Sequence, residues 1–76
     1  MAAPSYRIVV KGELGPLYAA AFDTMTLEPG GGETAIVGPV EDQAQLQGIL
    51  ERIAGLNLVL LSVNVVDDPA RVDAPR

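Results

Sequence analysis

The sequence predicts an α+β fold, and three observations support that class. Apolar residues recur at helical spacing over residues 42–55, residues 58–66 alternate with the period of a strand, and two shorter strand patterns flank a glycine-rich turn. With right-handed crossovers, these elements make a ferredoxin-like β-α-β-β-α-β sandwich, in which two helices cover one face of a four-stranded antiparallel sheet. The fallback is a smaller sheet, built around a ββ hairpin, with one helix.

A chain of 76 residues makes one domain, close to the lower limit at which a single core keeps a protein folded. We expect residues 6–66 to form this domain, with a disordered N-terminus at residues 1–5 and a disordered tail at residues 67–76. Aromatic residues make up only 4% of the chain, so the core must be aliphatic. A domain of this size often gains stability by pairing.

Composition argues against several classes of function. The chain has no cysteine and no histidine, which removes thiolate chemistry, cysteine-ligated zinc and the commonest general base. Its net charge is −5 and its basic residues form no run, so nucleic acid and anionic membrane are poor partners. There is no apolar stretch of bilayer length and no charged start followed by an apolar segment, which predicts a cytoplasmic protein. We expect no cofactor, no metal and no catalytic residue.

The first strand spans residues 6–11, and Gly12 ends it. The alternating pattern divides this strand between two faces of the sheet. The core face takes Tyr6, Ile8 and Val10, and the opposite face takes Arg7, Val9 and Lys11.

A short helix is expected next, over residues 17–22, with Pro16 in its first turn. A helix this brief is marginal alone and depends on docking against the sheet. Two packing arrangements are open: the buried side is either Leu17 with Ala20 and Ala21, or Tyr18 with Ala21 and Phe22.

A hairpin follows, in which Met25 and Leu27 share one side of the outgoing strand and residues 33–37 form the returning strand. Residues 29–32 are expected to form a longer flexible loop. This glycine-rich loop is not a phosphate cradle, because it lies between two strands rather than before a helix.

The long helix has the clearest pattern. Asp42 is suited to the N-cap, with Gln45 completing a capping box, and Gly55 is expected to stop the helix in the left-handed conformation. The adjacent acids Glu41 and Asp42 are explained by capping rather than by a metal. Gly48 is expected to let the helix approach the sheet. The core face of the helix is Leu46, Ile49, Leu50 and Ile53.

The last strand covers residues 58–66, and its odd-numbered residues are expected to meet the helix. The even-numbered residues, on the open face, begin with Leu58 and Leu60 and only then turn polar. A solvated sheet face should be polar throughout, so we expect Leu58 and Leu60 to be covered by something else.

The chain resembles a known group at several positions: Gly32, Thr34, Gly38, Pro39, Asp42, Gln43, Leu46, Gly48, Leu60, Leu61, Ser62 and Val63. These residues resemble a group of short, uncharacterised bacterial proteins of about this length with a predicted ferredoxin-like plait. The resemblance covers nearly all of residues 6–66 and rests mostly on turns, a cap and a core face. It implies no activity and supplies no catalytic residue. By fold analogy, small ferredoxin-like domains include ligand-sensing modules and sheet-to-sheet dimers.

The favoured hypothesis is a non-enzymatic interaction module that forms a homodimer through the open face of its sheet. The dry centre of that interface would be Val9, Val37 or Ile36, Leu58 and Leu60. Its rim would be Arg7, Lys11, Ser62 and Asn64.

A different protein in place of the second copy is one alternative, and two other hypotheses concern a ligand or a reaction. One is a regulatory domain that senses a small anionic metabolite through Arg7, Lys11, Gly12 and Gly15, near the end of the first strand. The other is a small cofactor-free enzyme with its site between paired sheets.

Overall fold

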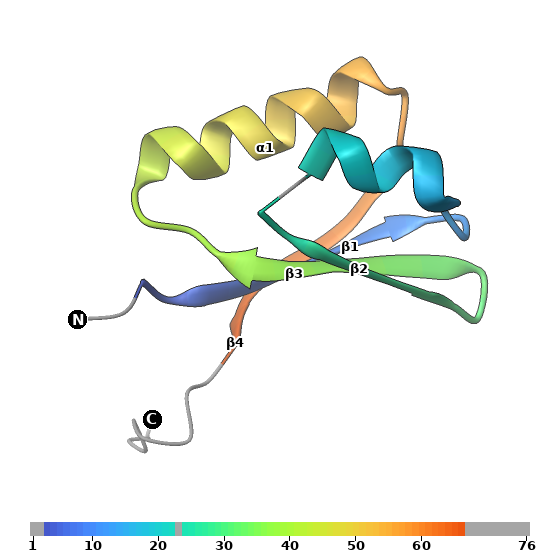
Figure 1. The fold of residues 1–76 in the computed structure, drawn as a ribbon, viewed down its shortest axis with the longest axis horizontal. Coiled ribbons are helices and arrows are strands. Elements are labelled where there is room, and N and C mark those ends of the chain that lie inside the picture. The colour runs from blue at the N-terminus through green and yellow to red at the C-terminus, as the bar shows by residue number, and fades with distance from the viewer. Residues whose placement is uncertain (1–2, 23, 67–76) are drawn as a thin grey trace.

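The computed structural model describes residues 3–22 and 24–66. Its strands are β1 (Ser5–Lys11), β2 (Thr26–Gly30), β3 (Glu33–Pro39) and β4 (Leu60–Val66), joined in one antiparallel sheet of order β2-β3-β1-β4. The 3-10 helix η1 (Pro16–Phe22) and the helix α1 (Gln43–Gly55) lie on the same side of this sheet (Figure 1). Neither covers the opposite face, which we call the open face. The predicted α+β class and four-stranded antiparallel sheet are confirmed.

The predicted two-helix, ferredoxin-like β-α-β-β-α-β order is wrong. Residues 16–22 form a 3-10 helix, and α1 is the only α-helix in the described part of the chain. Seven residues without an acidic first turn are too few to sustain an α-helical ladder. The segment instead begins with the tighter bond from the Tyr18 amide to the Gly15 carbonyl, 3.1 Å long. The expected alternative, an antiparallel sheet with one helix, describes the structure.

η1 is held by one buried aromatic side chain and by one hydrogen bond from a long side chain of α1. Phe22 is buried in the core, Tyr18 is half-buried, and Leu17 is exposed, so the second of the two packing arrangements is the one observed. The Arg52 side chain of α1 donates from Nη1 to the Ala21 carbonyl at 2.7 Å. This bond ties η1 to α1 above the sheet.

The β2–β3 hairpin turns more tightly than predicted. Its loop is only Gly31 and Gly32, with φ of 64° and 81°, the backbone of a type I′ turn. Two residues with positive φ suit glycine, and this turn matches the twist of the flanking strands. The longer loop predicted over residues 29–32 is therefore wrong, because Pro29 and Gly30 are paired with β3.

The start of α1 agrees with the sequence pattern. The Gln45 amide donates to Asp42 Oδ1 at 2.8 Å, which confirms the N-cap. The Gln45 side chain accepts from the Glu41 amide at 2.7 Å, one residue before the position that a capping box uses. The predicted core face of α1 is confirmed, since Ile49 and Ile53 are buried and their neighbours Leu46 and Leu50 pack against the core.

The end of α1 differs from the prediction. The helix runs through Gly55, and the left-handed residue is Asn57, with φ of 60°. The Leu58 amide donates to the Ile53 carbonyl at 3.1 Å, and the Asn57 amide to the Ala54 carbonyl at 3.0 Å, which together make a Schellman motif. This motif turns Leu58 back onto the core.

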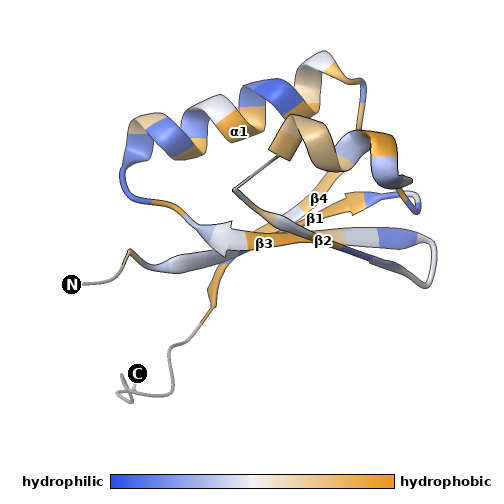
Figure 2. Ribbon diagram, viewed as in Figure 1, coloured by the Kyte–Doolittle hydropathy of each residue, from blue (hydrophilic) through white to orange (hydrophobic). Residues whose placement is uncertain are grey.

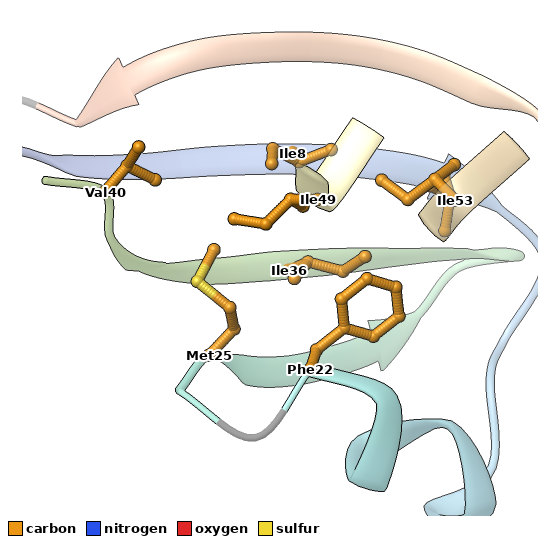
Figure 3. Close-up of a cluster of buried hydrophobic side chains, with 8 residues drawn as sticks. Ile8, Phe22, Met25, Ile36, Val40, Ile49 and Ile53 are labelled. Atoms are coloured by element: carbon orange, nitrogen blue, oxygen red, sulfur yellow. The ribbon is translucent and has the colours of Figure 1, made fainter. Parts of the chain in front are cut away.

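The core lies between α1 and the centre of the sheet (Figure 3). Its buried side chains are Ile8, Val10, Phe22, Met25, Ile36, Val40, Ile49 and Ile53. Each such side chain contributes about 1.5–3 kcal/mol by leaving water. Among the residues that the structure describes, none of this buried set comes from β4.

Gly48 and Gly38 give a matched test of packing. A Cβ at Gly48 would meet nothing within 4 Å, so the predicted close approach to the sheet is wrong, and Gly48→Ala should raise the free energy of unfolding by about 0.5–1 kcal/mol. A Cβ at Gly38 would lie 2.6 Å from Met25 Sδ and 3.0 Å from the Thr24 carbonyl oxygen. Gly38→Ala should therefore lower that free energy by about 1–3 kcal/mol. Urea denaturation measures the free energy of unfolding of both variants. A destabilised Gly48→Ala variant would contradict the finding that this position has room for a Cβ.

Candidate interaction surface

The pairing of β4 with β1 contains a bulge. Val9 lies opposite Ser62 and Val10 lies opposite Leu60, so Leu61 is an extra residue without a partner in β1. Side chains opposite each other across an antiparallel pair share a face of the sheet. The bulge therefore inverts the alternation of β4 partway along the strand.

The prediction that Leu58 and Leu60 lie on the open face is wrong. Leu58 packs against the core, and Leu60 pairs with Val10, whose side chain is in the core. Both leucines are on the helix side because they precede the extra residue Leu61. Leu60 is nevertheless 44% exposed, since it belongs to the outermost strand.

Beyond the bulge, the predicted faces of β4 are the observed ones. Ser62 pairs with Val9 and Asn64 pairs with Arg7, so both polar residues lie on the open face. Val63 faces the core. Ser62, Asn64, Arg7 and Val9 are thus brought together as the sequence predicts.

The apolar residues at the centre of the open face are less exposed than predicted. Val9 is 8% exposed and the adjacent Ala35 is 4% exposed, so both are already shielded within one chain. Arg7 and Lys11 flank Val9 on the same face, and side chains of this length can cover apolar surface with their methylene stems. Val37, the other predicted contact, is half-buried opposite Arg7.

Exposed apolar side chains gather instead along β4. Figure 2 shows that β4 is largely apolar, and this strand is the outermost one on its side of the sheet. The exposed set is Val59, Leu60, Leu61, Val65 and Val66, which we call the β4 edge. No charged residue occurs from Leu58 to Val66. An uncharged, apolar outer strand is a template for pairing with another strand.

The opposite margin of the sheet is protected. β2 has only five residues, and they include Glu28 and Pro29. A short edge strand with a charge and a proline resists pairing with another chain. The β2 edge therefore has a charge and a proline that resist pairing, whereas β4 after its bulge has neither.

The predicted ligand residues do not form one site. Arg7 and Lys11 are four positions apart on β1, about 13 Å along the strand. Gly12 lies beyond the end of β1, where its amide donates to the Gly32 carbonyl at 2.7 Å. Gly15 begins the turn into η1.

The loop after β1 is pinned by a hydrogen-bond network that the sequence pattern does not reveal. The buried Thr34 hydroxyl donates to the Gly12 carbonyl at 2.7 Å and accepts from the Leu14 amide at 2.9 Å. The Glu13 carboxylate accepts from the Gly32 amide at 2.9 Å. These groups bond within the chain, so they are not free to hold an anion. The only sequence signal was a threonine on the core face of a strand.

Two further findings concern the described residues. Residues 3–22 and 24–66 contain no group of three or more acidic, histidine or cysteine side chains placed to hold a metal ion. Within the same ranges, no helix has the length and apolar character needed to cross a membrane.

Comparison with known proteins assigns the chain to a family but gives no activity for it. The model of a domain of unknown function, DUF8691, matches residues 5–64. The chain belongs to this family. The DUF8691 match begins with β1, includes β2, β3 and α1, and ends within β4. No curated protein and no solved structure matched the chain.

Thr34→Val tests the pinned loop. The substitution keeps the shape of the side chain but removes both hydrogen bonds, leaving the Gly12 carbonyl and the Leu14 amide without their partner. We expect the free energy of unfolding to fall by about 1–3 kcal/mol. Thr26→Val, at an exposed position of β2, is the control and should change it by less than about 0.5 kcal/mol. Equal effects from both variants would refute the structural role of Thr34.

Proposed function

We propose that the chain is a small, non-catalytic interaction module that self-associates through its sheet. The observation that carries the proposal is the β4 edge, where four exposed apolar side chains of an uncharged outer strand are joined by Val59, the residue just before it. Exposed apolar side chains gathered at one margin of a small domain are typical of an interaction site. The partner is a second copy of the chain, giving a homodimer.

The proposed surface is centred on β4 rather than on the middle of the open face. Val9 and Ala35 gain little from further cover because they are already buried. Leu58 is used by the core. Ser62 and Asn64 keep their predicted place beside the contact, on the open face of the same strand.

Charge favours contact at this strand. The chain carries ten acidic residues and five basic ones, so two copies repel each other on average. Contact through β4 brings no like charges face to face, because the strand has none. A contact through β2 would oppose the Glu28 carboxylates of the two copies or bring them near each other.

Neither alternative hypothesis has a comparable observation behind it. The amide donors near the proposed metabolite site, those of Gly12 and Leu14, bond within the chain. A site between paired sheets would need a face-to-face contact, and the exposed apolar side chains gather at an edge instead.

Self-association is tested by mass in solution. Size-exclusion chromatography with light scattering at micromolar concentration should give twice the 7.9 kDa mass of one chain. Val65→Lys places a charge on the β4 edge and should return the mass to that of one chain. Thr26→Lys places the same charge on the β2 edge and should leave the mass doubled.

Circular dichroism of each variant verifies that the fold is retained. A wild-type mass of one chain across the whole concentration range would overturn the proposal. Equal dissociation by both lysine variants would show that association does not depend specifically on the β4 edge.

A further inference from the structure

We infer that β4 pairs antiparallel with β4 of a second copy, about a twofold axis at Asn64, so that the two sheets become one. This inference rests on the proposed self-association and specifies its geometry. It is an edge-to-edge contact rather than a contact between open faces. The argument follows from the direction of backbone groups, the bulge and the chemistry of Asn64.

The first step is the direction of the β1 backbone groups. The Lys11 amide donates to the Val59 carbonyl, on the β4 side, at 2.9 Å. The next amide, that of Gly12, donates to the Gly32 carbonyl, on the β3 side, at 2.7 Å. Because backbone groups alternate along a strand, odd-numbered residues of β1 bond toward β4 and even-numbered residues bond toward β3.

The second step gives the direction of the β4 groups. Val63 and Val65 lie opposite Ile8 and Tyr6, which are even-numbered. Their amides and carbonyls therefore point away from β1, toward the outer margin of the sheet. Asn64 lies opposite Arg7, so its backbone groups point toward β1. The backbone amides and carbonyls of Val63 and Val65 are therefore the groups with which a further strand would form hydrogen bonds.

The third step is the register. The extra residue Leu61 interrupts the regular pairing of β4, which leaves Ser62–Val66 as its regular stretch beyond the bulge. Asn64 is the midpoint of that stretch. A twofold axis at Asn64 places Val63 opposite Val65 of the second copy, where each residue exchanges backbone hydrogen bonds with the other. Ser62 then lies opposite Val66 of the second copy.

The chemistry of Asn64 favours a second copy as the occupant. A carboxamide carries both a donor and an acceptor, so it complements an identical carboxamide across the axis. Val63 and Val65 are β-branched residues that suit cross-strand pairs. The strand is uncharged, so self-pairing opposes no like charges. Pairing also covers part of Val65 and Val66, which are exposed in one chain.

Single cysteines test this register, because the chain has none of its own. In the inferred pair, Asn64 and its counterpart form a non-hydrogen-bonded pair with Cα atoms about 4.5 Å apart, within disulfide range. Asn64→Cys should therefore shift from single-chain to doubled mass on a non-reducing gel after mild oxidation. Ser62→Cys is the matched control on the same strand and face. Its counterpart lies about 13 Å away along the strand, so it should remain a single chain.

The outcomes separate this inference from the proposed function. Selective cross-linking of Asn64→Cys supports the inferred register. Equal or absent cross-linking of the two variants, with a wild-type protein that is dimeric by light scattering, overturns the edge pairing and leaves self-association standing. A wild-type protein that is monomeric by light scattering overturns both.

Discussion

A bulge at Leu61 decides which side of the sheet each β4 side chain occupies. Without this extra residue, strict alternation would place Leu58 and Leu60 on the open face with Ser62 and Asn64. With it, the two leucines lie on the helix side and the two polar residues remain on the open face. The bulge also limits the regular part of β4 to a short stretch after Leu61. Bulges commonly occur at sheet edges, where they change the aim of side chains.

The position of the core explains why β4 keeps exposed apolar residues. The buried side chains come from β1, β3, α1 and the segments around η1 and β2, and the 3-10 helix is anchored through Phe22 (Figure 3). β4 contributes only Val63 to the packing around this cluster. The outermost strand β4 therefore lies largely outside the core. The uncovered strand has no charge, whereas β2, at the other margin, has Glu28 and Pro29.

Local signals in the sequence predicted local structure well. The face of α1 and the Asp42 cap depend on spacings of three and four residues. The sequence did not indicate the bulge, because Leu60 and Leu61 are both apolar and the strand pattern continues through them without interruption. The choice of Asn57 over Gly55 as the left-handed residue depends on where Leu58 must return to the core. The contacts of Arg52 and Thr34 join residues far apart in the chain and leave no periodic signal.

Residue-resolved hydrogen exchange at two protein concentrations tests the central claim most directly. At a concentration where light scattering shows single chains, the outward amides of Val63 and Val65 should exchange rapidly, and the inward amide of Asn64 should exchange slowly. At a concentration where the protein is dimeric, all of these amides should exchange slowly, because the second β4 bonds the outward ones. Rapid exchange at Val63 and Val65 in a protein that is demonstrably dimeric would contradict the account.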